Sequence, residues 1–261
     1  MHGISVSGGV ESCIVKMIKL LLGDACNLDV DSNSVDLIIT HPPYLGIDTL
    51  RYGGDSSKQI NSSQNKKKML SLLNKATLEM VRVLKPGGHL IIANGQKDNL
   101  DIEYVLNCKS IKKIKYLDFI CQNSYDENDV DSSNRISSES IITWHHFIKE
   151  GDAYYNPFVT KRYRNPVWSL PANNIDATVD TLIHQDINII DTMNAEIPKR
   201  FIEMFTKKNA TVLDPFGGSA LVAVTAVELG RKGISNDISE EQNRAAEQRV
   251  LLTLGEKYVG R

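Results

Sequence analysis

Two short stretches near opposite ends of the chain carry residue types suited to chemistry on a nucleoside. The later stretch consists of Asp214, Pro215, Phe216, Gly217, Gly218 and Ser219. It follows a strand-like run and leads into an apolar helix, so glycine admits a ligand close to the backbone while the helix N-terminus offers unpaired N–H donors. About twenty residues later, Asp237 ends the next expected strand, where a carboxylate suits ribose hydroxyls. This spacing predicts a nucleoside-cofactor site, and a plain structural strand–turn–helix unit is the alternative.

The earlier stretch consists of Thr40, His41, Pro42, Pro43 and Tyr44 and follows a run of strand type. The two prolines fix the backbone and direct the carbonyls of His41 and Pro42 outward as rigid acceptors. Tyr44 offers a face for stacking a planar base. Acceptors aimed at the protons of an aromatic amine favour a pyramidal nitrogen, whose lone pair is free to attack. The stretch predicts a base-binding corner, with a structural Pro-Pro turn as the alternative.

Strand-like and helix-like runs alternate around both stretches. We expect strands over 19–24, 35–40, 89–93, 211–214 and 233–237, and helices over 67–84, 198–205, 220–229 and 239–254. The last helix opens on a capping box formed by Ser239 and Gln242. Such alternation predicts an α/β fold with a doubly wound, mostly parallel, Rossmann-like sheet. Further strands are expected over 114–120 and 140–148, separated by a polar excursion over 122–139.

Bulk composition sets limits on this interpretation. The chain has 261 residues, 41% of them apolar, and a formal net charge of −2, so any nucleic-acid surface must be local. The four cysteines lack the paired spacing of a zinc site, and we expect no metal. Without a leader or a membrane-length apolar run, we expect a soluble, cytoplasmic protein.

Taken together, the two stretches resemble the signature of the DNA amino-methyltransferases, Asp/Asn/Ser-Pro-Pro-Tyr plus Asp-Pro-Phe-x-Gly-Ser-Gly. Their order is similar to that of the circularly permuted β class. The resemblance covers roughly 20–95 and 195–250 and includes further similar stretches at 23–38, 82–88, 197–213 and 230–241. It implies a Rossmann-like methyltransferase sheet with permuted motif order and a small inserted recognition region. It also implies transfer of a methyl group from S-adenosyl-L-methionine to cytosine N4 or adenine N6 of a flipped base.

The resemblance also implies roles for individual residues. Asp24 would approach the cofactor's adenine, the Asp214–Ser219 turn its methionine portion and Asp237 its ribose, with Thr40 beside them. His41, Pro42, Pro43 and Tyr44 would form the catalytic corner. Three positions depart from the family pattern: His41 replaces Asp, Asn or Ser, Ala220 replaces the second glycine as a mild change at a helix start, and Met193 stands nearest a usual His.

The same resemblance implies a division of the chain. Residues 1–97 and 175–261 would form the catalytic and cofactor-binding domain, and 98–174 a sheet-edge hairpin and target-recognition segment. Double-stranded DNA is the expected partner, compatible with a companion restriction endonuclease in a restriction-modification system and with an oligomer. Candidate phosphate contacts are Lys66, Lys67, Lys68, Lys161, Arg162 and Arg164. The last three are preferred because Tyr163 and Trp168 interleave them, although solvated surface charge is the alternative for each group.

Several other functions compete. RNA remains an open substrate, whereas enzymes that methylate protein glutamine usually place the cofactor motif before Pro-Pro-Tyr. Cytosine C5 chemistry needs a cysteine nucleophile, and none of the chain's cysteines follows a proline. His41 and Ala220 motivate a second alternative, a catalytically weak or inactive module that binds cofactor and nucleic acid. A dinucleotide oxidoreductase lacks support because no G-x-G-x-x-G follows a strand.

Overall fold

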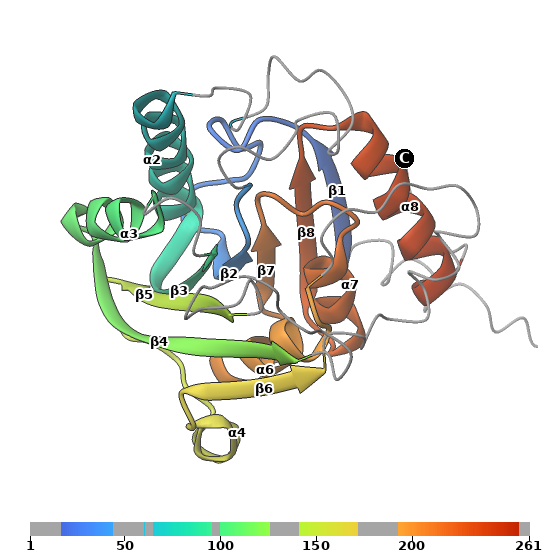
Figure 1. The fold of residues 1–261 in the computed structure, drawn as a ribbon. Coiled ribbons are helices and arrows are strands. Elements are labelled where there is room, and N and C mark those ends of the chain that lie inside the picture. Colours follow the sequence, from blue (N-terminus) through green and yellow to red (C-terminus); the bar gives the residue numbers. More distant parts are fainter. Residues whose placement is uncertain are drawn as a thin grey trace, which may run out of the picture.

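A computed structural model describes residues 17–43, 60, 65–95, 100–125, 141–171 and 193–255. Within them a single sheet has the strand order β1-β8-β7-β2-β3-β5-β4-β6 (Figure 1). The strands are β1 (Ile18–Leu22), β2 (Val35–Thr40), β3 (Leu84–Gly95), β4 (Ile114–Tyr125), β5 (Ile141–Lys149), β6 (Val167–Pro171), β7 (Thr211–Asp214) and β8 (Lys232–Asp237). Among these strands only β5 runs against its neighbours, so the predicted mostly parallel α/β sheet is confirmed.

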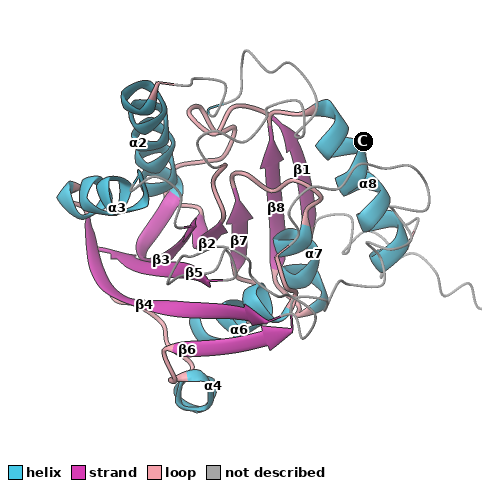
Figure 2. Ribbon diagram, in the orientation of Figure 1, coloured by secondary structure: helices cyan, strands magenta, loops and turns pink. Residues whose placement is uncertain are grey.

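Helices cover both faces of this sheet (Figure 2). They are α2 (Lys66–Val83), α3 (Leu100–Ser110), α4 (Pro157–Tyr163), α6 (Glu196–Phe205), α7 (Leu221–Glu228) and α8 (Glu240–Leu254). Successive strand residues point to opposite faces, so Ile38 packs with Met80 of α2 while Leu37 packs with Phe201 of α6. The first face is completed by α3 and the second by α7 and α8. Such two-sided coverage is the doubly wound arrangement expected from the sequence.

The middle of the chain extends the same sheet. β5 pairs with β3, β4 pairs with β5, and β6 closes this edge beside β4. β4 reaches Tyr125, beyond the strand expected over 114–120, whereas 126–140 lies outside the described residues. The sequence did not predict α3, α4 or β6.

Two histidines from neighbouring strands pack together in the interior. His146 of β5 and His89 of β3 are both buried, and His89 Nδ1 lies 2.9 Å from His146 Nε2. The ring of Phe205 stacks on His89 at a centroid distance of 4.5 Å. Burial, followed by the proximity of His146, lowers the pKa of His89 to about 3, so this ring is neutral inside the fold. None of the described helices has the length and apolar character needed to cross a membrane.

Candidate active site

The two sequence stretches meet at the carboxyl ends of adjacent strands. β2 and β7 are parallel neighbours, with Leu37 opposite Val212 and Ile38 opposite Leu213. Thr40 and Asp214 therefore end these strands side by side. The Thr40 hydroxyl donates a hydrogen bond of 2.8 Å to Asp214 Oδ1, and both residues are buried. The chain leaves this hydrogen-bonded pair in two directions. After Thr40 it enters the proline corner, which contains Pro42 and Pro43, and after Asp214 it enters the glycine turn, which contains Gly217 and Gly218.

Asp214 is a carboxyl group in an interior environment. Besides the Thr40 hydroxyl, its Oδ1 accepts the Phe216 backbone N–H at 3.0 Å, which fixes the turn that follows. Burial raises the pKa of Asp214 to about 7, although the hydrogen bonds from Thr40 and Phe216 act to lower it. The nearby charge of Asp237 adds to the increase. This carboxyl group therefore titrates close to neutral pH, well above an ordinary aspartate.

The turn after β7 needs its glycines for different reasons. A methyl group on Gly217 would overlap the side chain of Ser235, so no other residue fits there without rearrangement. Gly218 has φ +49°, a left-handed conformation that glycine adopts easily. Ala220, at φ 63°, is also left-handed. The replacement of glycine by Ala220 is therefore not the mild change that the sequence suggested, because a Cβ costs about 1–2 kcal/mol in this conformation.

Asp237 closes the turn from the neighbouring strand. Its Oδ2 accepts the Gly218 N–H and its Oδ1 accepts the Ser239 N–H, both at 2.9 Å. Burial raises the pKa of Asp237, and these backbone donors act to lower it. Each carboxylate oxygen has two lone pairs, so one backbone donor on each leaves acceptor capacity for two hydroxyl groups. The geometry is compatible with the ribose contact expected from the sequence.

Asp24 lies on the next strand end along the sheet. Leu22 of β1 pairs with Asp237, and the Gly23 N–H donates to the Asp237 carbonyl at 2.9 Å. The Asp24 carboxylate is exposed and accepts the Cys26 N–H at 2.8 Å. Asp24 follows β1, whereas Asp237, Asp214 and Thr40 are the last residues of β8, β7 and β2. These four strands are adjacent in the sheet and therefore bring the four residues to one side.

The proline corner continues directly from Thr40. His41 and Pro43 are half-buried, and Pro42 is buried. The His41 ring lies 6.0 Å from the buried ring of Trp144, with a tilt of 58° between their planes. Trp144 in turn donates its indole N–H to Gln122 at 2.9 Å. Tyr44, the expected stacking residue, and the loop 45–59 lie outside the described residues.

The candidate phosphate contacts fall into two separate places. Lys66, Lys67 and Lys68 open α2, where Asn65 accepts the N–H groups of Lys67 and Lys68. Lys66 also forms an ion pair of 2.9 Å with Glu103. Figure 1 shows this end of α2 on the side of the molecule toward which β7 and β8 point, whereas α4 lies at the opposite side.

The two aromatic residues expected to interleave the α4 cations differ in their surroundings, since Tyr163 is half-buried with Arg162 5.3 Å from its ring and Trp168 is buried. Trp168 is only 3% exposed, and with Tyr163 it holds the Arg200 guanidinium, 5.1 and 4.9 Å from the two rings. The interleaving of Trp168 with the cations therefore reflects core packing. Phe158, which lies in α4 with Lys161 and Arg162, is 86% exposed.

Sequence reasoning missed two buried side chains at the turn. Asn236 precedes Asp237 and donates to the carbonyls of Gly23 and Pro215 at 3.0 and 3.1 Å. Arg249 of α8 is fully buried and donates to the Ser219 hydroxyl at 3.1 Å. The signal for Arg249 was its helical spacing from Ala245 and Ala246, which places a charged residue on the face of α8 that packs against the core, where it needs a specific partner.

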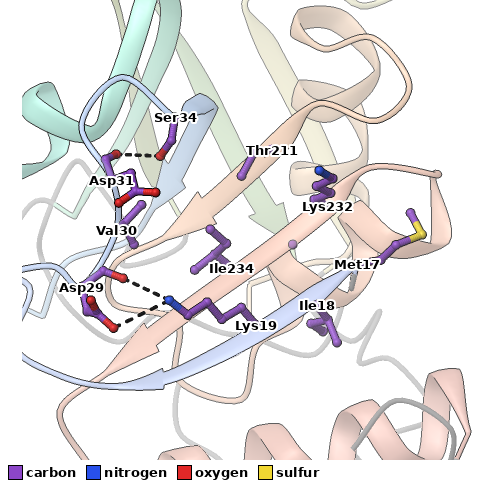
Figure 3. Close-up of a pocket in the computed structure, with 11 residues that line it drawn as sticks. Met17, Ile18, Lys19, Asp29, Val30, Asp31, Ser34, Thr211, Lys232 and Ile234 are labelled. Carbon is purple, nitrogen blue, oxygen red and sulfur yellow. Dashed lines mark hydrogen bonds and ion pairs between the residues drawn. The ribbon is translucent and has the colours of Figure 1, made fainter. Parts of the chain in front are cut away.

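A separate pocket of about 320 Å³ lies at the opposite end of the parallel strands, where β7 and β8 begin (Figure 3). It is lined by the first residues of β7 and β8, Thr211 and Lys232, and by Lys19, which pairs with Asp29 at 3.7 Å. None of the site residues expected from the sequence lines it. Ligands of doubly wound sheets bind at the carboxyl ends of strands, so we assign the candidate site to that edge and not to this pocket.

Comparison with solved structures identifies the class of fold. The PvuII DNA methyltransferase (cytosine-N4-specific) matches with a TM-score of 0.71 at 16% identity, covering 89% of this chain and 86% of that one. M1.HpyAVI in its SAM complex matches with a TM-score of 0.64 at 18% identity, covering 90% and 99%. The fold is therefore the α/β fold of the PvuII DNA methyltransferase and of M1.HpyAVI.

Sequence comparison then gives the family. The DNA methylase family model matches residues 35–248, and the chain belongs to that family. It is 27% identical over 247 residues to the type II methyltransferase M.BamHI of Bacillus amyloliquefaciens, covering 84% of this chain and 54% of that protein. A stretch of 49 residues, 19% of this chain and 22% of the relative, is 47% identical to YubD of Escherichia coli (strain K12). The chain thus spans about half the length of M.BamHI and less of YubD.

Proposed function

We propose that this protein transfers a methyl group from S-adenosyl-L-methionine to the exocyclic amine of a flipped base in DNA, cytosine N4 or adenine N6. The observation that carries this proposal is the hydrogen bond between Thr40 and Asp214, because it joins the base-binding corner to the cofactor turn at one sheet edge. Membership in the DNA methylase family supports it.

The residues at this edge fit the cofactor. Asp237 has acceptor capacity for both ribose hydroxyls, and the glycine turn leaves the backbone free of side chains where the methionine portion would lie. Asp24 stands one strand further on, where the adenine would lie. The hydroxyl proton of Thr40 is committed to Asp214, so Thr40 contributes by orienting that carboxyl group. When bound, the cofactor supplies an electrophilic methyl group on a positively charged sulfur.

The proline corner would prepare the attacking amine. The carbonyl of Pro42 accepts one amine proton, and the His41 carbonyl or its imidazole accepts the other, which favours a pyramidal nitrogen. With its amine protons held by these acceptors, the base nitrogen could accept the methyl group that the cofactor would supply, and it would then release one proton to solvent. Tyr44 would stack on the base and hold its amine in line with the methyl group. Such stacking contributes roughly 1–3 kcal/mol to base binding.

Duplex DNA requires contacts that offset extrusion of the base, which costs a few kcal/mol. We assign phosphate contacts beside the flipped base to Lys66, Lys67 and Lys68, because they lie on the side of the candidate site. Lys161, Arg162 and Arg164 would then meet flanking duplex. Residues 1–97 and 175–261 form the catalytic and cofactor-binding domain of this proposal, and residues 98–174 serve as its target-recognition segment. A companion restriction endonuclease and an oligomer belong to the same proposal.

Labelled-methyl transfer tests the proposed activity. Wild-type protein should label duplex DNA, and Asp237→Ala should label it poorly because cofactor affinity falls. RNA of the same sequence serves as the competing substrate, and preferential labelling of RNA would redirect the proposal. Cofactor binding without transfer to either nucleic acid would favour a non-catalytic binding module, the alternative motivated by His41 and Ala220.

A further inference from the structure

One buried amide connects the three strand ends assigned to the cofactor. Asn236 lies in β8 directly before Asp237 and is 1% exposed. Its Nδ2 donates to the Gly23 carbonyl at 3.0 Å and to the Pro215 carbonyl at 3.1 Å. Gly23 precedes Asp24, and Pro215 follows Asp214. A single side chain therefore links the segments that begin at β1 and β7 across β8.

The surrounding backbone is built to admit this amide. A Cβ on Gly23 would lie 2.8 Å from Asn236 Oδ1, so the absence of a side chain at Gly23 gives the amide its place. Main-chain hydrogen bonds run alongside, from the Gly23 N–H to the Asp237 carbonyl and from the Gly217 N–H to the Asn236 carbonyl, both at 2.9 Å. The segments containing Gly23 and Gly217 are thus each held to β8 by one backbone hydrogen bond and one hydrogen bond from the side-chain amide of Asn236.

The amide group is chemically suited to this double contact. Its nitrogen has two protons, one for each carbonyl, whereas a hydroxyl has one and an aliphatic side chain has none. Removing it leaves two buried carbonyls without their donor, which is unfavourable. The neighbouring backbone bonds remain, so the expected effect is a local change in the relative position of the segments.

We propose that Asn236 is a positioning residue that presets the spacing between the Asp24 segment and the Pro215–Ser219 turn around Asp237. This inference rests on the proposed function, because it takes these three places as the binding site of one extended cofactor. A ligand that spans all three strand ends binds more tightly when their spacing is set before it arrives. Asn236 itself is buried behind the site and acts through the segments that it holds.

The test uses Asn236→Ala and Asn236→Leu in the full chain. Isothermal titration with S-adenosylhomocysteine should show a dissociation constant raised by about tenfold or more in both variants, equivalent to about 1.4 kcal/mol. Methylthioadenosine, which lacks the methionine portion that the turn would hold, should lose affinity by less than about threefold. In steady-state transfer, KM for the cofactor should rise while kcat changes little, since Asn236 does not touch reacting atoms.

Tyr104→Phe is the matched control. It removes a buried hydrogen bond of 2.7 Å to Thr77, between α2 and α3, and so reproduces a loss of stability away from the strand ends. Its affinity for S-adenosylhomocysteine should equal that of wild type. Unchanged affinity in both Asn236 variants would overturn the positioning role, as would equal losses for the whole ligand and the fragment. A wild-type protein that fails to bind S-adenosylhomocysteine would instead refute the proposed function.

Discussion

Thr40 and Asp214 lie 174 positions apart in the chain and meet through a buried hydrogen bond of 2.8 Å. The bond exists because β2 and β7 are parallel neighbours whose carboxyl ends coincide. One of its partners begins the proline corner and the other begins the glycine turn. The proposed base site and the proposed cofactor site therefore begin at the same hydrogen bond, and a substitution at either residue is expected to affect both sites.

Replacing Thr40 by valine removes the hydroxyl while retaining the shape of the side chain. We expect a loss of about 1–3 kcal/mol in the free energy of unfolding and weaker binding of S-adenosylhomocysteine, because a buried carboxyl group loses its donor. Chemical denaturation and titration calorimetry measure the two effects. Thr77→Val, which breaks the buried contact with Tyr104, should lower stability without changing ligand affinity. Equal affinity for S-adenosylhomocysteine in Thr40→Val and wild type would argue against a structural link between the two proposed sites.

The raised pKa of Asp214 predicts a defined pH dependence of stability. Folding moves this pKa from 3.8 to about 7, so the folded protein holds a proton that the unfolded chain releases in that interval. The protonated carboxyl group favours the fold at low pH, and this contribution declines as pH rises through the interval. Asp214→Asn should abolish the decline. The measurement is the difference in unfolding free energy between wild type and variant across this pH range, and a constant difference would contradict the raised pKa.

Ala220→Gly should stabilise the protein. The left-handed conformation at φ 63° is unfavourable for alanine and accessible to glycine. Relief of that strain, reduced by the greater entropy of glycine in the unfolded chain, predicts a gain of about 0.5–1 kcal/mol. Ala226→Gly within α7 is the control and should destabilise by about 1 kcal/mol. A lower melting temperature for Ala220→Gly would show that Ala220 is not strained.

The two cation groups predict different dependences on DNA length. Changing Lys66, Lys67 and Lys68 to glutamine should weaken binding to short and long duplexes alike and lower the salt slope by about one per lost phosphate contact. The same change at Lys161, Arg162 and Arg164 should weaken binding only to long duplexes, because α4 lies at the opposite side of the molecule. Fluorescence anisotropy at several salt concentrations separates these outcomes. If the salt dependence of binding has the same slope in wild type and in both variants, neither group contacts phosphates and both are solvated surface charge.

The sequence predicted the parts of the fold whose patterns are local. The runs that became β2 and β7 are rich in apolar residues and end in polar ones, and the capping of α8 by Ser239 is confirmed by its hydrogen bond with the Gln242 N–H. Helix α3 escaped prediction because its apolar residues do not form one face. Ile102 and Leu106 are exposed while Tyr104 is buried.

The candidate site was predictable to the extent that it follows strand ends. Acidic residues after successive strands were visible in the sequence, but contacts between distant segments were not. No spacing rule indicated that Asn236 reaches Gly23, or that Trp168 would be buried and hold Arg200. The left-handed conformation of Ala220 depends on the path of the turn, which the sequence left undetermined.

The central claim is that the proline corner and the glycine turn form one site for methyl transfer to a base amine. Its most direct test is nucleoside analysis by mass spectrometry after duplex DNA has been incubated with S-adenosyl-L-methionine and wild-type, Tyr44→Ala or Asp237→Ala protein. We expect N4-methylcytosine or N6-methyladenine with wild type, loss of product with near-normal cofactor affinity in Tyr44→Ala, and about tenfold weaker cofactor binding in Asp237→Ala. Methylation at cytosine C5, or undiminished product in Tyr44→Ala, would contradict the claim.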